Sequence, residues 1–137
     1  MAKLYRAVYC SRCLIDDGER AIQAEIDRIL AVSAKNNARN DLSGALMFSF
    51  GYFLQVLEGA LNDVETTLAR IELDPRHDQF RLLELGPVRE RAFTKWGMLF
   101  AGARIGNDPR TRQAVERAIS AGSEGGEELL SFLLQAV

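Results

Sequence analysis

The sequence predicts an α+β domain in which a mixed five-stranded sheet carries two helices on one face. Five short segments are rich in aromatic and β-branched residues or alternate between apolar and polar ones, which is typical of strands. Two longer segments repeat apolar residues at helical spacing. The resulting order, β-α-β-β-α-β-β, is that of a ferredoxin-like split-βαβ fold with one added strand.

The first strand and helix occupy the first forty residues. Residues 4–11 alternate weakly and predict a strand, which Asp16-Asp17-Gly18 ends. Residues 19–37 predict a helix with an apolar stripe made of Ile22, Ile26, Ile29 and Leu30. The stripe continues through Ser33 and Asn37, so the buried face of this helix becomes polar toward its C-terminal end.

A hairpin follows, and its second strand carries an anomalous residue. Residues 44–50 predict one strand, and Gly51 turns it into the next, which runs to Gly59. Residues 52–57 of this later strand are apolar on both faces except at Gln55, which shares a face with Phe53 and Leu57. Burying an unpaired amide group costs roughly 1–3 kcal/mol. We therefore expect either a polar side chain or a bound ligand opposite Gln55.

The remaining elements are one helix, two strands and a helical C-terminal part. Asn62 is expected to cap the second helix, with Glu65 at capping-box spacing, and Asp74-Pro75 to end it. Strands are predicted at residues 79–85 and 96–101. Two further helices are expected after Gly106, which divides the chain into a domain at 1–104 and a helical extension at 105–137.

Composition excludes several classes of protein. The chain has 137 residues, of which 47% are hydrophobic and 26% charged, as in one soluble globular domain. Its formal net charge of −2 argues against a nucleic-acid-binding protein. No apolar run approaches the roughly 18 residues that cross a membrane, and the N-terminus lacks a signal peptide. We expect a cytoplasmic protein with no nucleic-acid or membrane partner.

Cys10-Ser11-Arg12-Cys13 is a CxxC motif, which favours thiol-disulfide chemistry when a helix starts beside it. Here the predicted helix begins several residues later, so the match is poor. No zinc site is expected, because there is no second cysteine pair and His77 is the only histidine. The glycine loops that bind phosphate are also absent.

Several polar residues have ordinary explanations when taken one at a time. Lys35 and Arg39 fit a solvated rim, and Arg70 with Asp74, four residues apart, fits a surface ion pair on a helix. Taken together, another set is able to line one space between the two helices and the sheet, namely Tyr9, Ser33, Asn37, Gln55 and Arg76. The segregated arrangement of helices produces a groove at this position.

An ordered series of motifs resembles the BLUF domain, a family of blue-light sensors that use FAD. The series covers about the first hundred residues and consists of Tyr9-x-Ser11, Asn36-Asn37, Leu42-Ser43-Gly44-Ala45-Leu46, Phe53-Leu54-Gln55-Val56-Leu57-Glu58-Gly59, Asp74-Pro75-Arg76-His77 and Phe93-x-x-Trp96-x-Met98. The resemblance implies the fold argued above. It also implies a flavin ring between the two helices and the sheet.

The resemblance further implies roles for individual residues. Tyr9 would be the electron donor, and Gln55 would be the switch between Tyr9 and the flavin. Trp96 and Met98 would change exposure in signal output. The cofactor-binding residues that it implies are Tyr9, Ser33, Asn36, Asn37, Gln55, Arg70, Asp74, Arg76 and His77.

We therefore expect a photoreceptor, not an enzyme, that binds the chromophore FAD and passes a signal to a separate downstream effector protein, with a homo-oligomer as its assembly. Two alternatives remain open. One is a non-photoactive ferredoxin-like module that binds a ligand or a protein, and the other is a CxxC thiol-disulfide oxidoreductase. The apolar segment Leu129–Leu134 is a candidate contact surface for a partner.

Overall fold

The computed structural model describes residues 3–14, 19–49, 52–93, 97–101, 113, 116–117 and 120. Within these residues the elements follow one another in the expected order. They are β1 (Leu4–Cys13), α1 (Glu19–Arg39), β2 (Ser43–Ser49), β3 (Tyr52–Ala60), α2 (Leu61–Glu72), β4 (His77–Val88) and β5 (Gly97–Ala101).

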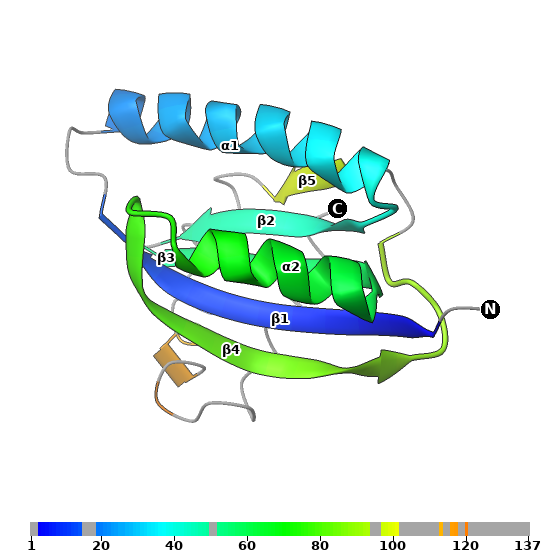
Figure 1. Ribbon diagram of the computed structural model, residues 1–137. Coiled ribbons are helices and arrows are strands. Elements are labelled where there is room, and N and C mark those ends of the chain that lie inside the picture. Colours follow the sequence, from blue (N-terminus) through cyan, green and yellow to red (C-terminus); the bar gives the residue numbers. More distant parts are fainter. Residues whose placement is uncertain are drawn as a thin grey trace.

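The strands form one sheet in the order β4-β1-β3-β2-β5. The first four are antiparallel to their neighbours, and β5 runs parallel to β2. Both helices lie on the same face of this sheet (Figure 1), where α1 packs against β5 and α2 packs against β3 and β1. The predicted α+β fold, with two helices on an antiparallel sheet, is confirmed. The two helices expected within residues 105–137 lie outside the described residues.

Two predicted boundaries are wrong for physical reasons. The fourth strand was expected to end at residue 85, before Gly86-Pro87, but β4 continues to Val88. Proline is tolerated there because β4 is an edge strand, whose outer side needs no ladder donor. Asn62 does not cap α2: Ala60, with extended dihedral angles, is the N-cap residue and makes no side-chain capping bond. The helix starts directly after β3, so Asn62 already lies inside it.

The register of β1 against β3 places the two most informative side chains together. Tyr9 is directly opposite Gln55, and both project toward the helices. A one-residue slip would turn every side chain of a strand to the other face of the sheet, so this pairing depends on the whole ladder. Apolar packing under α2 holds the ladder in place through Ala7, Leu42, Leu57, Val64 and Leu68.

Gly44 allows β2 to approach β3 closely. A Cβ atom at this position would lie 1.9 Å from the backbone oxygen of Val56, and Gly44 has a φ of 156°. Because the clash is with backbone, no side-chain rotation relieves it. Gly44 therefore fixes the spacing of the two strands that carry Leu46 and Gln55.

We predict that Gly44→Ala lowers the free energy of unfolding by about 2–4 kcal/mol, because the added methyl group must displace β2 from β3. Gly86→Ala is the matched control, since a Cβ there meets nothing within 4 Å. Chemical denaturation of the two variants measures the difference. Equal stabilities would contradict the close approach.

Candidate functional site

A cavity of about 410 Å³ lies between α1, α2 and the sheet. This volume is within the range of small-molecule and cofactor pockets. All nine residues that the family resemblance assigned to cofactor binding line it, from β1, α1, β3, α2, the α2–β4 connection and the start of β4. They are Tyr9, Ser33, Asn36, Asn37, Gln55, Arg70, Asp74, Arg76 and His77.

Seven further residues line the cavity without having been assigned to it, namely Arg28, Ile29, Val32, Leu46, Phe53, Thr67 and Ile71. Helical periodicity would have identified most of them. Stepping back from Ser33 by four residues gives Ile29, and stepping back from Arg70 by three gives Thr67. Leu46 comes from β2 and is directly opposite Gln55 in the ladder, so only the strand register identifies it.

The hydroxyl group of Tyr9 donates a hydrogen bond to Oε1 of Gln55. Both residues are buried, with 4% of each exposed. Burial raises the pKa of the Tyr9 phenol above its ordinary value, and the carboxylate of Asp74 adds to this effect. The phenol is therefore neutral and keeps its hydrogen. Phe80 stacks on the Tyr9 ring with centroids 4.8 Å apart and restricts its orientation.

Asn37 presents an unused donor in the cavity wall. The residue is 2% exposed, and its Nδ2 atom has no hydrogen-bond partner. An amide donor buried without a partner is unfavourable by about 1–3 kcal/mol. A ligand with acceptor atoms would remove this cost. The polar end of the α1 stripe, which was predicted from sequence, is thus the place where the protein requires a partner that it does not itself supply.

The mouth of the cavity is a chain of alternating charges. Asp74 accepts bonds from the backbone nitrogen and the guanidinium of Arg76, which lowers the pKa of its carboxyl group. Arg76 also contacts Glu25, 3.2 Å from Nη1 to Oε2, and Glu25 pairs with Arg28. The expected Arg70–Asp74 ion pair is wrong, because Asp74 binds Arg76 in its place. Arg70 lines the cavity from α2.

His77 joins three elements beside the cavity. Its Nδ1 atom lies 2.6 Å from Oγ of Ser11, and its Nε2 atom contacts the carbonyl oxygen of Ile71. A carbonyl oxygen only accepts, so Nε2 carries the hydrogen. These bonds fix the start of β4 against β1 and the end of α2.

Phe53 and Leu57, which share the face of Gln55, have different surroundings. Phe53 lines the cavity, whereas Leu57 packs in the core cluster that includes Tyr9. Trp96 lies outside the described residues. Met98 is described as part of the β5 backbone, where it pairs with Gly44.

The two cysteines are poorly placed for redox chemistry. Cys10 and Cys13 lie on β1 and are not joined by a disulfide. Because they are three residues apart on a strand, their side chains point to opposite faces of the sheet. Burial raises the pKa of Cys10 to about 11, whereas a reactive thiol requires a lowered pKa. The thiol-disulfide alternative is therefore unsupported.

The residues that line the cavity fit a flat ring with a heteroatom edge. Apolar side chains from both helices and the sheet supply the walls, and Gln55 and Asn37 supply amide groups. Within the described residues, no group of three or more His, Cys, Asp or Glu side chains is placed to bind a metal ion. None of the described helices is long and apolar enough to span a membrane.

Curated relatives of this chain include proteins named as photoactivated or as regulated by blue light. The chain is 36% identical over 75 residues to the photoactivated adenylate cyclase subunit beta of Euglena gracilis. The aligned residues cover 55% of this chain and 8% of that protein. It is 30% identical over 91 residues to the blue light- and temperature-regulated antirepressor BluF of Escherichia coli K12, covering 66% of this chain and 23% of that protein. The chain thus spans less than a quarter of the length of either protein.

Solved structures share the fold. The dark state of BlrB, a BLUF protein, superimposes with a TM-score of 0.72 at 25% identity and covers 99% of this chain and 96% of its own. A bacterial light-regulated adenylyl cyclase gives a TM-score of 0.71 at 25% identity, covering 98% of this chain and 40% of its own.

The family comparison covers the whole cavity. The model of the family described as "Sensors of blue-light using FAD" matches residues 4–99. This range includes all elements from β1 through β4 and every residue that lines the cavity. This match spans more than two thirds of the chain. The chain belongs to the BLUF family of flavin-dependent blue-light sensors, whose cofactor is FAD.

Proposed function

We propose that this protein is a photoreceptor in which Tyr9 and Gln55 convert blue-light absorption into a changed hydrogen-bond pattern. The observation that carries the proposal is the bond from the Tyr9 hydroxyl to Gln55 Oε1 in the wall of the cavity. Asn37, with its unpartnered donor, and the residues Ser33, Asn36 and His77 would hold the flavin ring. Arg70, Asp74 and Arg76 would contact the cofactor at the mouth.

When bound, FAD absorbs blue light and in its excited state is a strong oxidant. Tyr9 is a suitable donor because its phenol is neutral, stacked on Phe80 and bonded to an acceptor. After loss of an electron the phenol becomes acidic, and its proton can move along the existing bond to Oε1 of Gln55. A bound flavin would supply the acceptor for this electron. Return of the electron and the proton to Tyr9 would then regenerate both the phenol and the cofactor.

Gln55 retains the change. Its amide has one acceptor side and one donor side, and either rotation or tautomerisation exchanges what it presents to Tyr9 and to the cavity. A new hydrogen bond from this side chain to the cofactor would shift absorption to the red. The rearrangement is local, and its output requires an element that responds to it.

The proposed output passes through Trp96 and Met98 to a separate effector protein. Residues 1–104 would be the sensor, and residues 105–137 a helical extension with the apolar segment Leu129–Leu134 as a contact surface. The family match ends at residue 99, which supports this division. The protein would assemble as a homo-oligomer. The cyclase and antirepressor activities named above are those of the relatives.

We predict that Gln55→Leu still binds flavin but loses the light-induced red shift, because leucine fills the same space without a donor or an acceptor. Flavin content and the light-minus-dark absorption spectrum measure the two properties. A normal red shift in this variant would remove Gln55 from its proposed role. A non-photoactive module, the remaining alternative, would give no shift in the wild-type protein.

We predict that Tyr9→Phe retains flavin and loses the native photocycle, since phenylalanine has no hydroxyl group to donate. Tyr52→Phe is the matched control: Tyr52 is half-buried at the start of β3 and is absent from the cavity wall. Flash-induced absorption changes distinguish the two. Equal photocycles in both variants would contradict the role of Tyr9.

Because burial raises the pKa of Tyr9, we predict that its phenol stays protonated as pH rises through the ordinary tyrosine value of about 10. A near-ultraviolet titration of tyrosinate should therefore give the same amplitude for the wild-type protein and Tyr9→Phe while both remain folded. An amplitude larger by one tyrosine in the wild-type protein would show that Tyr9 ionises normally.

A further inference from the structure

Glu58 is a fully buried carboxylate three residues beyond Gln55 on β3. An odd spacing on a strand places the two side chains on opposite faces of the sheet. The carboxylate accepts three hydrogen bonds, from Arg6 Nε at 2.8 Å, Ala92 N at 2.9 Å and Phe93 N at 2.8 Å. Glu58 thus fastens the segment after β4 to the strand that carries Gln55.

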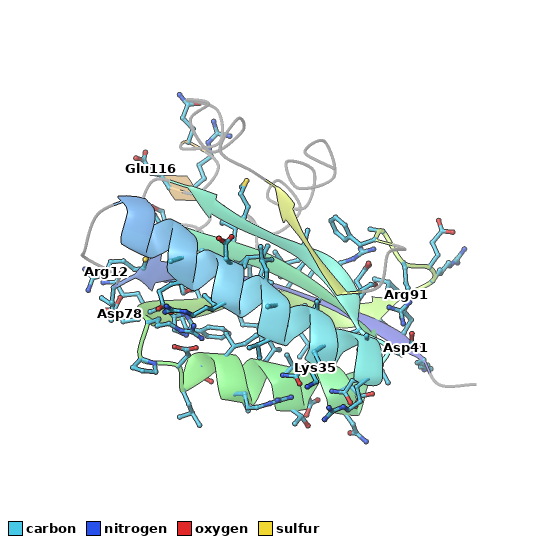
Figure 2. All side chains as sticks on the ribbon, turned by 90° about the horizontal axis from the view of Figure 1, so that it is seen from above. Arg12, Lys35, Asp41, Asp78, Arg91 and Glu116 are labelled. Atoms are coloured by element: carbon cyan, nitrogen blue, oxygen red, sulfur yellow. The ribbon has the colours of Figure 1, made fainter. Side chains whose placement is uncertain are left out.

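Arg91 completes this attachment from the segment itself. Its Nη1 atom donates to Ser43 Oγ at 2.7 Å and to the backbone oxygen of Glu58 at 3.1 Å. Its Nη2 atom donates to the backbone oxygen of Asp41 at 2.7 Å. Figure 2 shows Arg91 beside Asp41 at the C-terminal end of α1. One guanidinium therefore joins β2, β3 and the α1–β2 turn.

These contacts reach the two polypeptide segments that carry the buried amides of the cavity. Gln55 lies on the strand of Glu58. Asn37 lies at the end of α1, and its carbonyl oxygen accepts a bond from Leu42 N at 2.8 Å, which closes the turn that holds Asp41. The attachment therefore binds the two segments that carry Gln55 and Asn37, while its own residues lie outside the cavity wall.

The attached segment leads directly to β5. Ser43, which accepts the bond from Arg91, is also the residue that pairs with Gly97 at the start of β5. Moving residues 91–93 away from Glu58 would leave the buried carboxylate with Arg6 alone of its three donors and would leave two backbone N–H groups without their acceptor, which is unfavourable. A displacement of β3 at Glu58 must therefore be followed by these residues.

We propose that Glu58 and Arg91 are positioning residues that couple the hydrogen-bond state of Gln55 to residues 89–101. We call Arg6, Glu58 and Arg91, with the backbone of Ala92 and Phe93, the connector clamp. The inference rests on the proposed function, because the Gln55 rearrangement is the event transmitted. The clamp touches neither the cavity nor the cofactor, so it acts after the photochemistry.

The test separates photochemistry from transmission. Glu58→Gln removes one acceptor oxygen and places an NH₂ group against N–H donors. Arg91→Met keeps an unbranched apolar side chain without the guanidinium and leaves the Glu58 carboxylate with its own partners, so it remains informative if Glu58→Gln fails to fold. In FAD-loaded protein, the light-minus-dark spectrum reports the red shift, and amide hydrogen exchange of residues 89–101 reports transmission as a lit-to-dark rate ratio.

We expect the wild-type protein to show a ratio clearly different from one. Both clamp variants should keep the full red shift, with a ratio close to one. A structural role alone would change exchange equally in the dark and in the light, and would leave the ratio as in the wild type. Asp78→Asn is the matched control, since it removes a carboxylate bonded to Arg12 at the far end of the sheet from Arg91 (Figure 2).

The control should keep both the red shift and the wild-type ratio. A wild-type ratio in both folded clamp variants would overturn the inference, and so would a loss of the ratio in Asp78→Asn, or a red-shifting wild-type protein whose ratio is one. Absence of a red shift in the wild-type protein would instead contradict the proposed function.

Discussion

The buried hydrogen bond between Tyr9 and Gln55 is the interaction on which the rest of the site depends. Each residue alone would leave a polar group unpaired among apolar neighbours, and the antiparallel register brings them together as a directly opposed pair. The bond uses the amide oxygen of Gln55. It thereby orients the amide, and with it the hydrogen-bonding group available to a ligand.

The polarity of the cavity lining increases from its inner wall to its mouth. The inner wall combines apolar side chains with the unpartnered donor of Asn37, whereas the mouth carries the charge chain from Arg28 through Glu25 and Arg76 to Asp74. The opposite face of β3 carries another charge, the fully buried Glu58. One strand thus presents a neutral amide to the cavity and a carboxylate to the segment that leads to β5.

Much of this arrangement could be predicted from local pattern. Helical spacing identified the polar end of the α1 stripe at Ser33 and Asn37, and strand alternation identified Gln55 as an anomaly. Patterns fail where contacts are set by register or by competition between partners. Leu46 enters the cavity only through its pairing with Gln55, and Asp74 binds Arg76 rather than Arg70 because the tight turn brings the closer partner to it. The clamp on Glu58 joins residues 34 and 35 apart in sequence, which no local pattern indicates.

In the proposed photocycle, light changes the hydrogen-bond pattern of Gln55 while the cofactor itself returns unchanged. The most direct measurement is the absorption spectrum of the FAD-loaded wild-type protein in the dark, under blue light and after recovery in the dark. We predict a yellow protein whose flavin bands keep their shape, move to the red and return fully. A protein that ignores added FAD, or whose flavin spectrum is the same in light and dark, would contradict the account.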